Sequence, residues 1–127
     1  MLVKKSYFNM EKKSGVRRIG SAMANSFSGL SFLIKKETAF RQEIVLTAVL
    51  LPLAFWIGET AIEVSLLVLT VGFILVIEAL NTAIEKTVDR IGLERNLLSG
   101  IAKDVGSAAV LISFVIAVAI WGIIIIW

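Results

Sequence analysis

Four polar side chains recur at helical spacing in an otherwise apolar stretch of the sequence. Glu78, Asn81, Glu85 and Asp89 stand at positions i, i+3, i+7 and i+11. At 100° per residue, Glu85 and Asp89 return to within about 20° of Glu78 around a helix axis, so the set forms one stripe. Carboxylates in or beside a membrane are costly and indicate a functional site. The alternative is a solvated helix end, and it fits Asp89 better than Glu78, which directly follows an apolar run.

Two further segments carry side chains that can do chemistry: Glu37, Arg41 and Glu43 in one, and Lys103, Asp104 and Ser107 in the other. Simpler interpretations exist for both segments. Glu37 and Arg41 are four residues apart and could merely pair on a helix. Lys103 and Asp104 could form an interfacial ion pair at a helix start. Ser107 lies beside Gly106 and Ala108, and such small residues also allow close helix packing.

The chemistry of these side chains favours a hard cation and a phosphate. The chain has no His and no Cys, which excludes a Cys/His zinc site, a disulfide framework and a histidine base. Carboxylate oxygens suit Mg²⁺ or Ca²⁺, and proteins usually hold Mg²⁺ with one or two carboxylates plus substrate phosphates. A lysine adds charge for the phosphates. The set predicts phosphoryl transfer from a nucleotide to a lipid hydroxyl, although no common nucleotide-binding motif is present.

The elements that position these residues are membrane spans. The 127 residues are 57% hydrophobic and 18% charged, against roughly 45–50% and about 25% in soluble domains. Residues 105–127 contain no charge, and ~20 apolar residues cross a bilayer. We predict one integral-membrane domain with transmembrane helices over residues 37–57, 61–88 and 100–127.

Basic residues predict the orientation of these spans. Nine of the 13 Lys and Arg residues lie between Lys4 and Arg41, and the other four follow residue 85. With three spans, all 13 fall on one side of the membrane. The positive-inside rule places the N-terminus in the cytoplasm and the C-terminus outside.

The N-terminal region predicts a helix on the membrane surface. Five apolar residues recur every three or four positions: Ile19, Met23, Phe27, Leu30 and Ile34. This spacing defines one apolar face of a helix, and the flanking basic residues favour an anionic membrane surface. We predict a tail over residues 1–13 and the amphipathic helix over residues 14–36.

Three strings give the chain a close resemblance to the prokaryotic diacylglycerol kinases, which are small integral-membrane lipid kinases. The strings are ETAFRQE at residues 37–43, EALNTAIEKTVDRIG at 78–92 and LSGIAKDVGSAAVL at 98–111. The resemblance covers residues 17–127. It implies an all-α homotrimer, each subunit having a surface helix and three transmembrane helices, with active sites between subunits. It further implies transfer of the γ-phosphate of Mg-ATP to the sn-3 hydroxyl of diacylglycerol, giving phosphatidic acid at the bacterial inner membrane.

The resemblance also implies roles for single residues, carried over by motif position. Glu78 resembles the catalytic base, which contacts the lipid, and Glu37 and Glu85 resemble the metal-binding carboxylates. The other residues implied to contact or support ATP are Arg18, Asn81, Asp89, Lys103 and Asp104. The other residues implied to lie near the lipid are Arg41, Glu43 and Ser107. Some relatives have an aromatic pair where this chain reads Asn25-Ser-Phe27, so a stacking contact from Asn25 is not expected.

Three alternatives to a diacylglycerol kinase stay open at this point. A branch of the same family phosphorylates undecaprenol, but its first motif usually departs from the Phe-Arg-Gln-Glu found here at residues 40–43. A small proton-coupled transporter would use Glu78 as an intramembrane carboxylate. A structural or pore-forming oligomer would explain the small residues after residue 99 but not the clustered carboxylates. No nucleic-acid partner is expected.

Overall fold

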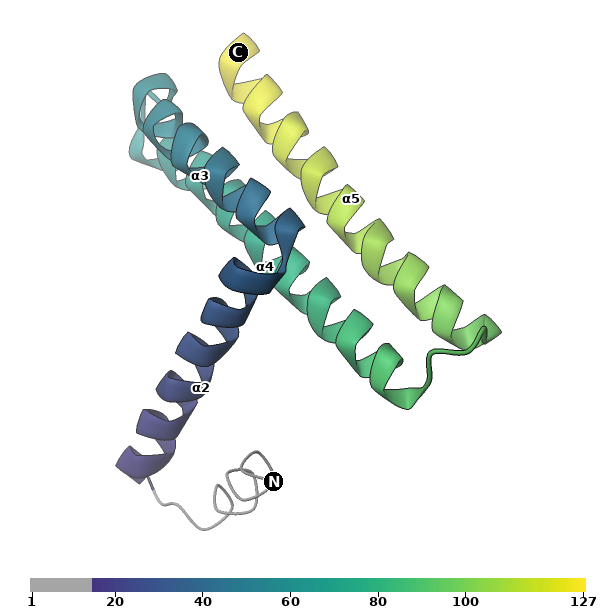
Figure 1. Cartoon of the computed structure of the whole chain (residues 1–127). Helices are drawn as coiled ribbons and strands as arrows, with labels where there is room; N and C mark the ends of the chain where they lie inside the picture. The colour runs from purple at the N-terminus through teal and green to yellow at the C-terminus, as the bar shows by residue number, and fades with distance from the viewer. Residues whose placement is uncertain (1–14) are drawn as a thin grey trace. The chain divides into compact units, whose positions relative to one another are not determined.

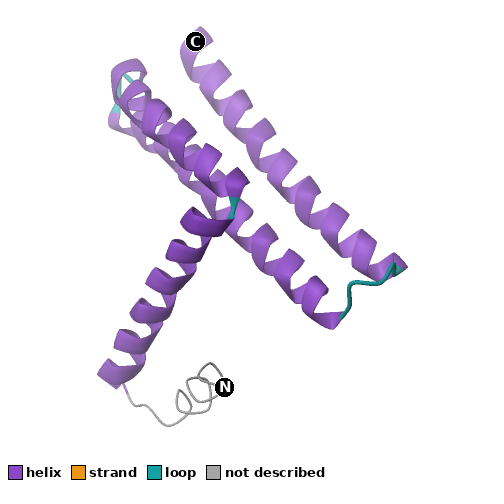
Figure 2. Cartoon of the chain, viewed as in Figure 1, coloured by secondary structure: helices purple, strands orange, loops and turns teal. Residues whose placement is uncertain are grey.

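The computed structural model describes residues 15–127, so the predicted tail over residues 1–13 lies outside the described residues. This part of the chain contains four helices and no strand (Figures 1 and 2): α2 (Gly15–Lys36), α3 (Thr38–Ile57), α4 (Ala61–Ile91) and α5 (Leu97–Ile126). The last three are long and apolar enough to cross a membrane. The predicted all-α class, with one amphipathic helix before three membrane helices, is confirmed.

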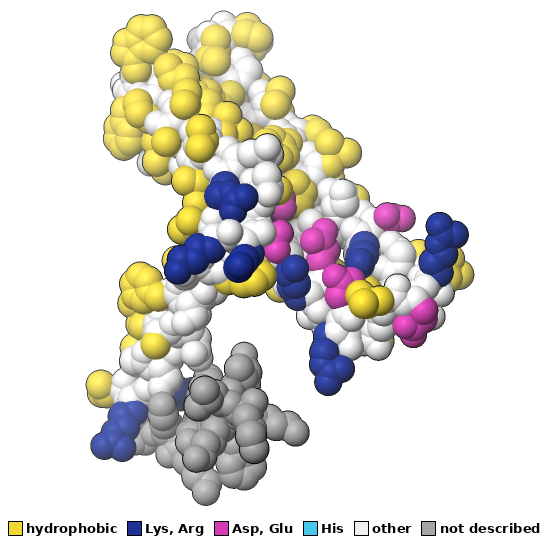
Figure 3. Space-filling view, in the orientation of Figure 1, with side chains coloured by type: hydrophobic (Ala, Val, Ile, Leu, Met, Phe, Trp, Pro, Cys, Tyr) yellow, Lys and Arg dark blue, Asp and Glu magenta, His cyan; other side chains and the backbone are white. Residues whose placement is uncertain are grey.

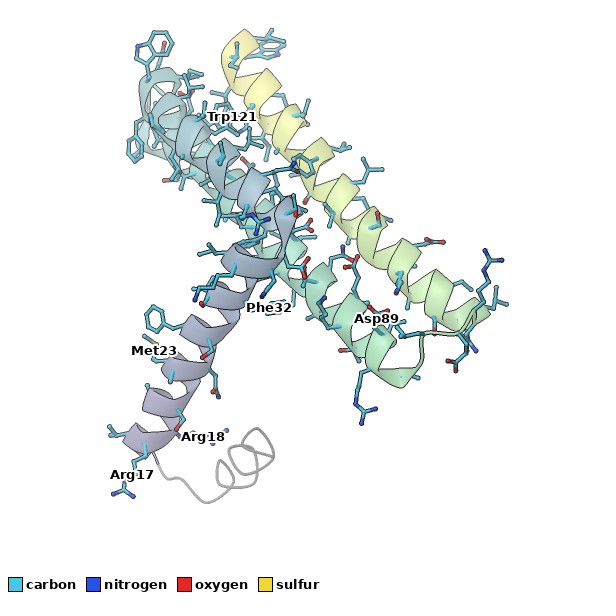
Figure 4. All side chains as sticks on the ribbon, viewed as in Figure 1. Arg17, Arg18, Met23, Phe32, Asp89 and Trp121 are labelled. Atoms are coloured by element: carbon cyan, nitrogen blue, oxygen red, sulfur yellow. The ribbon has the colours of Figure 1, made fainter. Side chains whose placement is uncertain are left out.

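The chain divides into two units, residues 1–37 and residues 38–127, and each is described by itself. Helix α2 forms the described part of the first unit. Its apolar face is exposed, with Ile19 66% and Phe27 65% accessible. Met23 and Arg18 project from different sides of the helix (Figure 4), as an amphipathic helix at a membrane surface requires.

The second unit is a bundle in which α4 packs against both α3 and α5. Its centre is dry and tightly packed, since Leu67 and Ala54 are fully buried and Ser113 is 1% exposed. Most other apolar side chains of these helices face outward. Over α3–α5, hydrophobic side chains cover one end, while acidic and basic side chains gather at the other (Figure 3).

The turn between α3 and α4 is short and well defined. Thr60 caps α4: its hydroxyl accepts the Glu63 N–H at 3.2 Å, and the Glu63 carboxylate accepts the Glu59 and Thr60 N–H groups. This reciprocal capping box satisfies backbone donors that a helix start leaves open. Gly58 precedes it, where an added Cβ would lie 2.5 Å from Val64 Cγ2.

The bounds of the last two helices differ from the sequence prediction. Helix α4 extends to Ile91 rather than ending at residue 88, and α5 begins at Leu97 rather than at residue 100. Asn96 explains the second difference, because its side-chain oxygen accepts the N–H groups of Leu98 and Ser99 at 3.0 and 3.2 Å. An asparagine N-cap stabilises the first turn of a helix. Helix α3 begins one residue later than predicted, at Thr38.

One polar contact joins α4 and α5 within the apolar end of the bundle. The indole N–H of Trp121 (labelled in Figure 4) donates to the Thr70 hydroxyl at 3.0 Å. That hydroxyl donates in turn to the Leu67 carbonyl at 2.7 Å. Thr70 is only 4% exposed, so water cannot take the place of a hydrogen-bonding group that a substitution removes from this contact.

Replacing Thr70 with Val should therefore destabilise the bundle. The indole N–H loses its acceptor in an apolar setting, and we expect a loss of about 1 kcal/mol of unfolding free energy. Thermal unfolding in detergent measures the loss. The matched control is Thr87→Val, since Thr87 is exposed and bonds only to the Ala83 carbonyl one turn away. Equal effects of the two variants would contradict a stabilising role for the Trp121 contact.

Candidate functional site

Helix α4 carries the predicted polar stripe as one continuous element from Ala61 to Ile91. Exposure rises along the stripe: Glu78 and Asn81 are each 8% exposed, whereas Glu85 and Asp89 are half-buried. Asn81 and Glu85 lie one turn apart, and the Asn81 amide Nδ2 donates to Glu85 Oε1 at 3.5 Å. The stripe thus connects a dry region of the bundle to its charged end.

Helix α3 brings a second carboxyl group to the dry end of the stripe. Glu43 is 9% exposed, and its carboxyl group lies within hydrogen-bonding reach of that of Glu78. Its Oε2 atom is buried and has no hydrogen-bond donor within residues 15–127. Two carboxyl groups this close present several acceptor oxygens to an incoming hydroxyl hydrogen.

Helix α5 supplies a cation to the exposed end of the stripe. Lys103 Nζ lies 2.7 Å from Asp89 Oδ1, with 44% and 39% of the two side chains exposed (Asp89 is labelled in Figure 4). The interfacial ion pair considered for Lys103 in the sequence had Asp104 as its partner, whereas the structure pairs Lys103 with Asp89. Lys103 also lies within electrostatic range of Glu85.

A hollow of about 440 Å³ adjoins this ion pair at the turn between α4 and α5. Its polar lining comes from both helices and the turn: Asp89, Glu94, Arg95, Asn96, Ser99 and Lys103. The sequence analysis did not single out Arg95 and Asn96, which lie between the two helices, and the structure shows Asn96 as the N-cap of α5.

The remaining predicted site residues are less tightly grouped. Asp104 and Ser107 are exposed on α5, and Arg41 is exposed on α3, where its Nη2 donates to Thr38 Oγ1 at 3.2 Å. Arg18 and Glu37 belong to the first unit, with Arg18 exposed on α2 and Glu37 directly after that helix. The bundle alone therefore brings together Glu43, Glu78, Asn81, Glu85, Asp89 and Lys103.

The metal-binding capacity of one chain is partial. No group of three acidic, His or Cys side chains within residues 15–127 is arranged to hold a metal ion. The half-buried Glu85 carboxylate is an oxygen donor oriented by Asn81. That donor chemistry fits Mg²⁺, which takes one or two carboxylates and completes its octahedron with phosphate oxygens and water.

Comparisons with known proteins point to one family. Residues 24–125 match the sequence model of the family described as prokaryotic diacylglycerol kinase. A diacylglycerol kinase of Haemophilus influenzae is 45% identical over 113 residues, which cover 89% of this chain and 96% of that protein. The Escherichia coli K12 diacylglycerol kinase is 45% identical over 108 residues, covering 85% and 88%. That of Pseudomonas aeruginosa PAO1 is 39% identical over 109 residues, covering 86% and 89%.

Removing the ion pair should have little effect on stability. Both side chains are about 40% exposed, and pairs in such surroundings contribute about 0.2–1 kcal/mol. We expect Asp89→Asn to lower the unfolding free energy by less than 1 kcal/mol, and high salt to shrink the difference from the parent chain. Thermal unfolding in detergent at two salt concentrations measures both effects. A loss of several kcal/mol that is insensitive to salt would show that Asp89 has another structural role.

Proposed function

The chain belongs to the prokaryotic diacylglycerol kinase family, and from this premise we propose that it transfers the γ-phosphate of ATP to the sn-3 hydroxyl of diacylglycerol. The observation that carries the proposal is the buried Glu43–Glu78 carboxyl pair at one end of a stripe whose other end is exposed and charged. A lipid hydroxyl approaches from the apolar side, and a nucleotide approaches from the aqueous side.

At the lipid end, Glu78 accepts the hydrogen bond of the substrate hydroxyl and takes its proton as the phosphoryl group transfers. Glu43 lies beside it with an oxygen that has no donor in the described chain, so the substrate hydroxyl would satisfy a buried acceptor. Phosphoryl transfer depends mainly on positioning and charge neutralisation, so a carboxylate is a sufficient base. Arg41 and Ser107 are assigned to the lipid side by motif position.

An apolar groove supports the placement of the lipid. It has a volume of about 300 Å³, lies among α3, α4 and α5, and is lined by Leu46, Leu50, Val71, Ile74, Phe114, Ala117, Val118 and Trp121. Ile74 precedes Glu78 by one helical turn, so the groove continues from the carboxyl pair toward the apolar end of the bundle. An acyl chain in this groove would leave the glycerol hydroxyl next to Glu78.

At the nucleotide end, Glu85 would hold Mg²⁺, which would neutralise charge on the ATP phosphates. Glu37 is assigned to the same metal by motif position. ATP carries about four negative charges and Mg²⁺ offsets two, so the acidic stripe needs a further cation. Lys103 is suited to this role, since its bond to Asp89 is partly exposed and is therefore readily exchanged for a phosphate contact. Arg18, Asn81, Asp89 and Asp104 contact or support the nucleotide around this position.

The functional unit is a homotrimer with active sites between subunits. One observation supports this assembly: only 11% of the apolar window of α5 is buried within one chain. A neighbouring subunit would cover part of that surface. We propose that the charged end of the bundle lies at the cytoplasmic face of the bacterial inner membrane, because basic residues favour that side.

The experiment that tests this function is an assay of ATP consumption by the purified chain in mixed micelles. We expect phosphatidic acid to form only when diacylglycerol and Mg²⁺ are both present. A preference for undecaprenol over diacylglycerol would move the chain to the other branch of the family. ATP consumption that is independent of any lipid, or none at all, would contradict the proposal and reopen the transporter and pore alternatives.

Replacing Glu78 with Gln should abolish most turnover while leaving nucleotide binding intact. The amide cannot take a proton, and the loss of a general base lowers kcat by about 10²–10⁴-fold. The measurement is kcat together with the apparent KM for Mg-ATP. Glu59→Gln is the matched control, because Glu59 is exposed beside the turn at the other end of α4. A Glu78→Gln variant with the parent rate would exclude Glu78 as the base.

Replacing Glu85 with Gln should instead change the metal dependence. A neutral amide is a weaker Mg²⁺ ligand than a carboxylate, so we expect the Mg²⁺ concentration at half-maximal rate to rise about tenfold or more. A Mg²⁺ titration at saturating ATP measures it, again beside Glu59→Gln. Reduced turnover with an unchanged Mg²⁺ requirement would assign Glu85 to another role.

A further inference from the structure

Gly106 on α5 directly faces the Asn81 side chain on α4. A Cβ added at Gly106 would overlap Asn81 Oδ1, and it would lie 3.4 Å from Asn81 Cγ and 3.8 Å from Ile84 Cδ1. Gly106 is buried, and Asn81 is 8% exposed. The space that an alanine side chain would take at position 106 is therefore occupied by the amide of Asn81.

The Asn81 amide is positioned by packing more than by hydrogen bonds. Its Oδ1 atom is buried and finds no donor within residues 15–127. Its Nδ2 atom faces Glu85 Oε1 at 3.5 Å, a long hydrogen bond that a small rotation of the amide would break. The backbone of α5 at Gly106 is the surface that keeps the amide turned toward Glu85.

The other glycines of α5 do not share this role. At Gly100 and Gly122 an added Cβ would meet nothing within 4 Å. If glycines served only close helix packing, all three positions on α5 would be equivalent. The contact with Asn81 distinguishes position 106 from positions 100 and 122.

We propose that Gly106 is a positioning residue for the phosphoryl-transfer site: its missing side chain lets Asn81 lie against α5 and orient the Glu85 carboxylate. The inference rests on the proposed function, in which Glu85 holds the metal of Mg-ATP. Partners that orient a metal ligand typically alter metal affinity or activity by about 10–100-fold when they are lost. Gly106 acts on the Glu85 carboxylate only through Asn81.

The test compares Gly106→Ala with Gly122→Ala in the full-length chain. We expect Gly106→Ala to raise the apparent KM for Mg-ATP about tenfold and to leave the KM for diacylglycerol unchanged. Binding of Mn²⁺ with a non-hydrolysable ATP analogue, followed by electron paramagnetic resonance, should weaken by a similar factor without any turnover. Gly122→Ala should match the parent chain in both measurements. A Gly106→Ala variant that behaves like Gly122→Ala would overturn the proposal.

A double-variant comparison separates positioning from a general packing defect. In an Asn81→Ala background the space beside α5 is empty, so adding Gly106→Ala should cost nothing further in nucleotide binding. The same loss in both backgrounds would show that the Cβ disturbs something other than Asn81. If Gly106→Ala alone fails to fold, the double variant Asn81→Ala/Gly106→Ala should still fold as well as Asn81→Ala does. A double variant that fails to fold would also overturn the proposal.

Failure of this inference and failure of the proposed function give different results. A parent chain that phosphorylates diacylglycerol, with a Gly106→Ala variant of unchanged nucleotide binding, contradicts only the role of Gly106. A parent chain without lipid-dependent ATP consumption contradicts the proposed function itself.

Discussion

Removing water from charged and polar groups is the constraint on which the rest of this structure depends. In hydrocarbon a backbone can satisfy its polar groups only within a helix, and each charged side chain is costly. The three apolar helices follow from the first requirement. The second confines nearly all acidic and basic residues of α3–α5 to one end of the bundle (Figure 3) and to the turn between α3 and α4. Glu43 and Glu78 are the exceptions, buried side by side where neither is well solvated.

The gradient of exposure along α4 is what makes a single helix suitable for joining two unlike substrates. Buried carboxyl groups favour a hydroxyl donor that arrives from an apolar phase. The exposed carboxylate of Asp89, which lies beside Lys103, exchanges partners easily because water screens its contacts. The helical repeat keeps both ends on one face, and the ends are about 16 Å apart along the axis at 1.5 Å per residue. In the proposed function, that length would let one element contact a lipid headgroup and a nucleotide.

Features that depend on one helix were predictable from the sequence, and features that depend on two were not. Hydrophobic length predicted three membrane helices, and the 100° repeat predicted the stripe on α4. The predicted end of α4 and start of α5 were wrong by three residues each, because the prediction did not take Asn96 as the N-cap of α5. The contacts of Glu43 with Glu78, Lys103 with Asp89, and Gly106 with Asn81 each join neighbouring helices. They depend on helix rotation and register, which the periodicity of a single helix does not determine.

The capping box at the α3–α4 turn also bears on how the chain enters a membrane. The Glu63 carboxylate accepts the N–H groups of Glu59 and Thr60, so part of its hydration is replaced before the turn meets hydrocarbon. The turn between α4 and α5 is also capped, by the uncharged Asn96, but it carries Glu94 and Arg95 as exposed side chains that would keep their full hydration. Moving the first turn into hydrocarbon would therefore cost less free energy than moving the second.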